Sequence, residues 1–168
     1  MARPLRLVSL APLAGLALSA CYGFLPAPER RDRVREATQQ EHRRCTPQSA
    51  DPRIFAPEDV ASVEPLYSYV QTSGSNREAR LLGAQVRLRP LPGVTSELLT
   101  YQLMCRSAQL VLGRVQAAEN EPYWLPDGWV SIDVHSVDGD FVVALEGEDV
   151  AEAREILERA RAFAHAKP

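Results

Sequence analysis

The stretch VSIDVHSVDGDFVVALEG, residues 130–147, decides the fold of this chain. Its Asp138-Gly139 pair lies between two valine-rich runs, and an Asp-Gly pair between alternating apolar residues is the strongest short-range signal for a β-hairpin. Folding the chain back at this turn puts three residue pairs on one face: Ile132 with Leu145, Val134 with Val143, and Ser136 with Phe141. The hairpin therefore has a consistent register. Its second strand, FVVAL, is apolar on both faces, which predicts a central place in a sheet.

A strand and a helix precede this hairpin. Apolar and polar residues alternate over residues 84–89, which predicts a half-buried strand that ends at Pro90. Thr95 can cap a helix that runs to about Leu112, and Gly113 is a typical stop. The predicted core stripe of this helix comprises Leu98, Tyr101, Cys105, Ala108 and Leu112.

A final helix follows the hairpin. Asp149 can cap it, and Glu152 three residues later makes a variant of the capping box. Its predicted core stripe comprises Val150, Ala153, Leu157, Ala160 and Ala164, flanked by Ile156 and Phe163. Residues 81–166 therefore read as strand, helix, strand, strand, helix. That order predicts an α+β domain, a small antiparallel sheet with the helices on one face.

A charged helix is predicted over residues 29–45. The sequence ERRDRVREATQQEHRRC contains no glycine or proline, and its apolar seam consists only of Val34, Ala37 and Cys45. Such a helix is mostly solvated and marginal on its own. We expect it to lie over the second face of the sheet, where Val142 would otherwise be exposed.

Residues 46–80 are predicted to be an irregular connection, because four prolines interrupt them. Within this stretch, one short helical turn is expected after Pro57. A short strand is expected over residues 66–70.

The N-terminus has the pattern of a secretory signal. Arg3 and Arg6 precede an apolar run over residues 7–18, which at about 12 residues is too short to span a bilayer as a helix. The run ends in LSAC, which resembles the lipobox of bacterial lipoproteins. That resemblance implies cleavage before Cys21, a diacylglycerol on the Cys21 thiol, and acylation of the new amine. The alternative is an ordinary signal peptide cut after Ala20.

Several consequences follow if residues 1–20 are a lipoprotein signal. The Pro-containing residues 21–28 would be a tether from lipid to protein. Several acyl chains would hold the chain permanently at a membrane without crossing it. In enteric lipoproteins, an aspartate directly after the lipid-bearing cysteine retains the protein at the inner membrane. This chain has Tyr22 at that position, so the resemblance favours the outer membrane, facing the periplasm.

The three cysteines of the chain support the same interpretation. An odd number in an exported protein leaves one without a partner. If Cys21 carries lipid, Cys45 and Cys105 remain for one disulfide in an oxidising compartment. The alternative is a pair of free buried cysteines.

The chain as a whole resembles small bacterial lipoproteins of uncharacterised function. The likeness covers most of the mature chain and is carried by Cys21, Cys45, Pro92-Gly93-Val94-Thr95, Cys105 and the strand–helix unit of residues 141–163. It implies no activity. Some such proteins have a histidine directly after the helix cysteine and a cysteine in a Pro-Tyr-x-Pro-like segment. Arg106 and Trp124 stand at these places here, which argues against a shared metal site.

Candidates for chemistry are few. His42 and Cys45 have helical i, i+3 spacing and with Cys105 could make three metal ligands, but a disulfide would remove both sulfurs. Asp133 and His135 share the outer face of a strand without a recognisable nucleophile. The net charge of −3 and the lack of a basic stripe argue against nucleic acid. We therefore predict a protein that is not an enzyme and has no metal or cofactor.

One aromatic segment remains. Tyr123, Trp124 and Trp129 surround a Pro-Asp-Gly turn. Such rings can stack sugars or enter a partner's pocket, or they can seal the edge of a small core. The sequence thus predicts a non-enzymatic interaction or structural module at the envelope, with an unspecified envelope partner. The alternative is a binder of a glycan or peptidoglycan fragment through residues 123–129.

Overall fold

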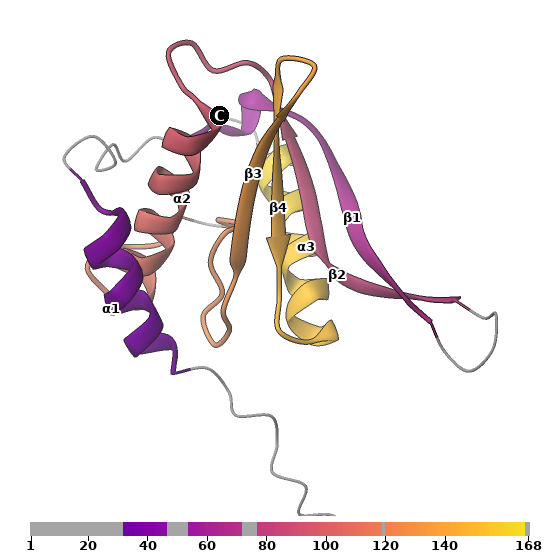
Figure 1. The fold of residues 1–168 in the computed structure, drawn as a ribbon, viewed down its shortest axis with the longest axis horizontal. Coiled ribbons are helices and arrows are strands. Elements are labelled where there is room, and N and C mark those ends of the chain that lie inside the picture. Colours follow the sequence, from indigo (N-terminus) through magenta and orange to yellow (C-terminus); the bar gives the residue numbers. More distant parts are fainter. Residues whose placement is uncertain (1–31, 47–53, 72–76, 119, 167–168) are drawn as a thin grey trace, which may run out of the picture. The chain divides into compact units, whose positions relative to one another are not determined.

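The described chain is built on a four-stranded antiparallel sheet, with one helix packed behind it and the other helices beside it (Figure 1). The computed structural model describes residues 32–46, 54–71, 77–118 and 120–166, all within the unit Arg31–Pro168. In chain order the elements are α1 (Arg33–Arg44), η2 (Pro57–Asp59), β1 (Val60–Gln71), β2 (Arg77–Leu88), α2 (Ser96–Val111), β3 (Ser131–Val137), β4 (Asp140–Glu146) and α3 (Val150–His165). The strands lie in the order β1-β2-β4-β3. The predicted α+β class is confirmed.

The predicted hairpin is present with the predicted register. Asp138 and Gly139 have φ angles of 53° and 89°, the left-handed values that a two-residue type I′ turn needs. All three predicted pairs occur between β3 and β4, among them Ile132 opposite Leu145. β4 pairs with β2 on its other side, so the FVVAL strand is central, as predicted.

The prediction of an irregular connection over residues 46–80 is wrong for its second half. β1 occupies Val60–Gln71 and contains the short strand that was predicted over residues 66–70, and β2 already begins at Arg77, inside the predicted connection. Pro65 pointed away from a strand, but β1 is at the edge of the sheet. An edge strand tolerates proline because one side of its backbone has no partner strand.

Several predicted features fall outside the described residues. They are the signal (1–20), the tether (21–28), the first residues of the charged helix (29–31) and the segments 47–53 and 72–76.

The short helical turn predicted after Pro57 is present as η2.

α2 has two buried faces instead of the single stripe that was predicted. Leu99, Leu103 and Leu110 are buried in the main core beside the sheet. Cys105 and Ala108 are also buried, and Ala108 packs with Ala37 of α1. The stripe prediction was incomplete because α2 lies between β3 and α1. Its other predicted members are only half-buried: Leu98, Tyr101 and Leu112.

α3 lies behind the sheet in Figure 1 and covers its core face. Asp149 caps it by accepting hydrogen bonds from the backbone N–H groups of Ala151 and Glu152. Val150, the first residue of the helix, is 41% exposed and does not belong to the core as predicted. The buried residues of α3 are Ala153, Ile156, Leu157 and Ala160.

The expectation that α1 covers the second face of the sheet is wrong. α1 packs along α2, beside the sheet rather than over it (Figure 1). Val142 is only 2% exposed without a helix above it, and its neighbours in register are Arg87 and His135. α1 offers a single buried apolar side chain, Ala37, which suits close contact with one helix better than coverage of a sheet.

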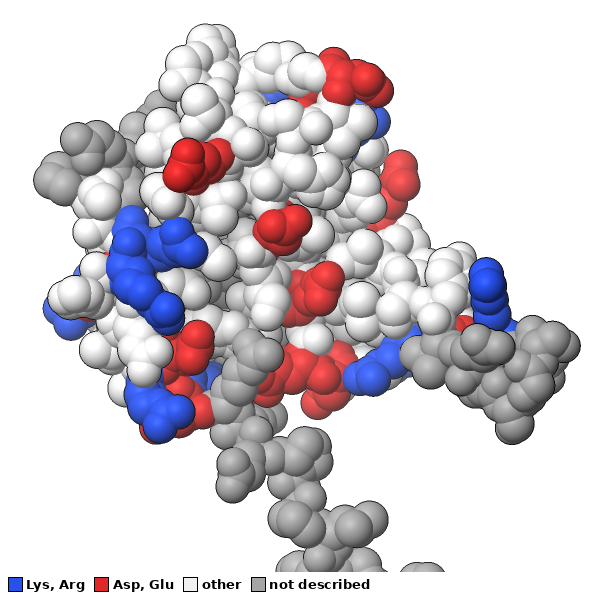
Figure 2. All heavy atoms as spheres, viewed as in Figure 1, with Lys and Arg blue, Asp and Glu red and all other residues white. Residues whose placement is uncertain are grey.

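The open face of the sheet carries scattered acidic side chains. Figure 2 shows carboxylates over the middle of this face, while blue side chains gather over α1 and at the far end of β1 and β2. Exposed acids here include Glu64 and Asp133. Arg87 also lies on this face and is paired with Asp140 at 2.6 Å, and this pairing raises the Arg87 pKa.

Candidate functional site

A disulfide joins Cys45 to Cys105, as the sequence predicts. The Sγ atoms are 2.03 Å apart and the Cα atoms 4.9 Å, within the usual range for such a bond. Cys45 directly follows α1 and Cys105 is in the middle of α2. Because the bond occupies both sulfurs, neither is available with His42 as a metal ligand. No cluster of three or more potential metal ligands occurs in the part of the chain that the structure describes.

The disulfide is one of several contacts that hold α1 on α2. Gln40 Nε2 donates a 2.7 Å hydrogen bond to the carbonyl oxygen of Met104. Glu41 forms a 2.9 Å ion pair with Arg114. These contacts are polar because α1 has little apolar surface to bury. Sequence reasoning missed Gln40, whose burial on a charged helix has no local signal.

A small pocket opens where α1, α2 and the start of β3 meet. Its volume is ≈ 180 Å³, below the range of about 300–1,000 Å³ that is typical of small-molecule sites. The lining residues are Glu36, Gln40, Met104, Trp129, Val130, Ser131 and Ile132. The pocket is therefore small for a site that encloses a drug-sized ligand.

The three aromatic residues singled out in the sequence lie in three different surroundings. Tyr123 is 6% exposed in the main core, where its ring meets that of Phe55 edge-on at 6.0 Å. Trp129 is 5% exposed in a second cluster with Ala37 and Ala108. Trp124 is half-buried, with the Arg159 guanidinium 5.4 Å from its ring centroid. The rings thus do not form one shared stacking surface.

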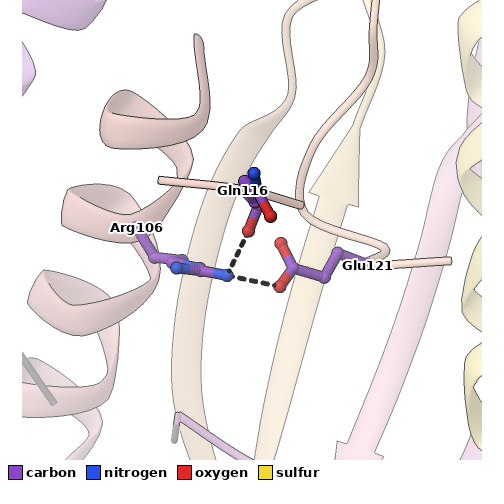
Figure 3. A network of polar contacts seen from close by, with 3 residues as sticks. All are labelled: Arg106, Gln116 and Glu121. Carbon is purple, nitrogen blue, oxygen red and sulfur yellow. Dashed lines mark hydrogen bonds and ion pairs between the residues drawn. The ribbon is translucent and has the colours of Figure 1, made fainter. Parts of the chain in front are cut away.

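A buried ion pair holds the chain just before this aromatic segment. Arg106 of α2 donates to Glu121 at 2.8 Å and to the carbonyl oxygen of Gln116 at 2.9 Å (Figure 3). Arg159 Nε donates to the backbone carbonyl of Glu121 at 3.2 Å. Burial lowers the pKa of Arg106, but the hydrogen bond and charge of Glu121 outweigh it and raise that pKa overall. This cluster fixes the loop to two helices.

The sequence did not reveal this pair. Arg106 follows Cys105 on an amphipathic helix, where an arginine normally reaches solvent, and Glu121 is fifteen positions away. Glu121 is nevertheless only 4% exposed. Arg106 Nε and Glu121 Oε2 have no hydrogen-bond partner among the described residues. The hydrogen bonding of the pair is therefore incomplete, and we expect the pair to hold the loop in place without adding much stability.

Tyr123 is expected to make the stability of the fold fall at alkaline pH. Burial, helped by the Glu121 charge, raises the pKa of Tyr123 above its usual value, and Arg106 opposes this only in part. The native state therefore keeps the phenol protonated where the unfolded chain ionises it, near pH ~10. Stability from this group is complete below that pH and is lost as the pH rises above it.

We expect the Tyr123 effect to be measurable by comparison with Tyr123→Phe. Between about pH 9 and about pH 11, the wild type should lose up to about 1.4 kcal/mol of unfolding free energy per pH unit more than the variant. Urea midpoints across this range measure the difference. Parallel curves for the two proteins would show that Tyr123 ionises normally in the folded state.

Asp133 and His135 lie on the open sheet face, as the hairpin register requires. The His135 Nδ1 atom is 3.7 Å from an Asp133 carboxylate oxygen, and the two side chains are 52% and 82% exposed. A polar contact so open to water contributes little. Both side chains are mostly open to solvent, which does not favour a role in orienting a substrate.

No protein-family model matches this sequence, and no curated protein or solved structure matches it significantly. Among the described residues, none of the helices is sufficiently long and apolar to span a membrane.

Proposed function

We propose that this chain is a lipid-anchored protein of the bacterial cell envelope, held through Cys21 at the outer membrane and facing the periplasm. The supporting observation is the Cys45–Cys105 disulfide. It is typical of an oxidising compartment, and it uses the other two cysteines of the chain. Cys21 is then left alone at the end of a signal-like segment, as lipidation requires. Residues 1–31 lie outside the described part of the chain.

The domain acts as an interaction or structural module without enzymatic activity. Three features support this role. The pocket beside Trp129 is small, the Asp133–His135 pair is open to water, and two of the three aromatic rings are packed inside the protein. The surface, rather than a cavity, is then the part available to an envelope partner.

A second candidate is a binder of a glycan or peptidoglycan fragment. Trp124 favours it, because this ring is only half-buried and lies beside Arg159 at the surface of the core. A partly exposed aromatic ring can contribute to the binding of a small ligand. Tryptophan emission that stays constant during titration with envelope glycans would rule out this alternative.

The anchor is tested with Cys21→Ala. We expect the wild type to incorporate radiolabelled fatty acid and to sediment with membranes, and the variant to do neither. Val34→Ala, at a position that is 59% exposed on α1, serves as the control, since it leaves both the lipid site and the disulfide in place. A wild-type protein without label, or a variant that sediments like the wild type, would contradict the proposed anchor.

A further inference from the structure

The first two strands extend well beyond the rest of the sheet. β2 pairs with β4 only from Leu88 to Gly83, whereas its pairing with β1 continues to Arg77, opposite Gln71. The paired residues 67–71 and 77–82 therefore form a two-stranded ribbon, here called the arm. Figure 1 shows it projecting away from α3 and the other strands.

The arm leaves the sheet at Gly83. Its φ of +155° suits glycine, and a Cβ here would lie 2.0 Å from the carbonyl oxygen of Leu145. The β1–β2 register shifts between Leu66 and Tyr67, directly opposite this point. Gly147 donates a 2.9 Å backbone hydrogen bond to Leu82, which closes the sheet where the arm leaves it.

The arm exposes large aromatic side chains. Tyr67 is 48% exposed and Tyr69 is 70% exposed. Both tyrosines point to the same side of β1, since they are two positions apart. A two-stranded ribbon is marginal in water, and a third strand is normally needed to make it stable. The arm is thus an incomplete sheet with an aromatic surface.

In the arm, β1 has a partner strand on one side only among the described residues. No other described strand pairs with its outer edge. Within the sheet, Pro65 and the register shift near Val60 interrupt it, as is common at protected edges. Beyond Pro65, the run LYSYVQ (66–71) has neither proline nor charge and is rich in residues that favour strands. The charged arm residues Arg77, Glu78 and Arg80 are all on β2.

We propose that two copies of this chain pair through the arm edges of β1, antiparallel about a two-fold axis at Ser68. A second copy fits this edge because the uncharged run meets no like charge when it faces itself. The register places Tyr67 of each copy opposite Tyr69 of the other, a favourable aromatic cross-strand pair. The two arms then form one four-stranded ribbon with an isologous interface. This pairing does not depend on the lipid anchor.

Crosslinking through Ser68→Cys tests the register. Facing residues in antiparallel strands have Cα atoms about 4.5–5.5 Å apart, which suits a disulfide. The full-length variant, in its membrane or in detergent, should form a covalent dimer under mild oxidation. Val34→Cys, whose position is 59% exposed on α1, should stay uncrosslinked. Wild type treated in parallel reports any free Cys21 thiol, which separates failure of the anchor from failure of the pairing.

Mass measurement in detergent tests the interface without a covalent bond. Wild type should have the mass of two chains, and Tyr69→Lys that of one, since lysine on an edge strand blocks pairing. Val34→Lys adds the same charge on α1 and should leave the dimer intact. Far-UV circular dichroism spectra like that of the wild type show that both variants retain the fold. A monomeric wild type without Ser68→Cys crosslinks, a dimer that survives Tyr69→Lys, or crosslinking to a different envelope protein would overturn the proposal.

Discussion

Gly83→Ala is expected to be the most damaging single substitution in the described chain. The new methyl group would lie 2.0 Å from the Leu145 carbonyl oxygen, and Leu145 is a fully buried residue of the central strand β4. Neither backbone can move aside, because β2 and β4 are the two inner strands. We expect the unfolding free energy to fall by roughly 4 kcal/mol or more, a large part of the ~5–15 kcal/mol typical of a domain.

Gly139→Ala is the matched control for this experiment. It makes the same substitution at another positive φ, +89°, but no atom lies within 4 Å of the added Cβ. Backbone strain alone should then cost about 1–3 kcal/mol. Urea denaturation followed by tryptophan emission compares the two variants. Equal losses would mean that backbone strain, and not the approach of β4, makes Gly83 necessary.

Loss of the disulfide is expected to have the second largest effect. Cys45 and Cys105 are 60 positions apart, and closing a loop of that size stabilises the folded state by about 4 kcal/mol through the entropy of the unfolded chain. Cys45→Ser should therefore lower the unfolding free energy by about that amount. Denaturation of the oxidised wild type, the reduced wild type and the variant measures it.

The damage from Cys45→Ser should begin in α1. Ala37 is the only apolar side chain that α1 buries, so without the bond the helix should exchange its amide hydrogens and be cut by proteases before the sheet opens. Glu41→Gln is the control. It removes the ion pair with Arg114, whose side chain is 59% exposed, and should change stability by less than about 1 kcal/mol. Unchanged protection of α1 in Cys45→Ser would show that its noncovalent contacts suffice.

The parts of the fold that depend on local chemistry could be predicted from the sequence. The Asp138-Gly139 turn fixes its own φ angles and with them the register of β3 and β4. Thr95 and Asp149 could be predicted as caps because the side chains of these residue types accept hydrogen bonds from nearby backbone N–H groups. In the structure each accepts such a bond from within the next three residues. The disulfide followed from counting cysteines and from their places on two helices.

The parts that depend on tertiary context could not be predicted. In the sequence alone, Pro65 indicates the end of a strand. It is compatible with β1 only because β1 is at the edge of the sheet. The second buried face of α2 exists because α1 packs there, which no periodicity within α2 can show. Arg106 and Glu121 of the candidate site meet only after α2 and the following loop are in place.

The position of the disulfide determines how the domain bears mechanical load. The chain enters α1 at Asp32, and the covalent bond is at the opposite end of the helix, at Cys45. A pull from upstream would peel α1 from α2 one turn at a time, starting with the hydrogen bond from Arg33 to Pro126. Peeling must stop at Cys45, where force passes directly into the middle of α2. Unwound, residues 32–45 span roughly 45 Å, so under load α1 would lengthen by unwinding before the force reaches α2 through the disulfide.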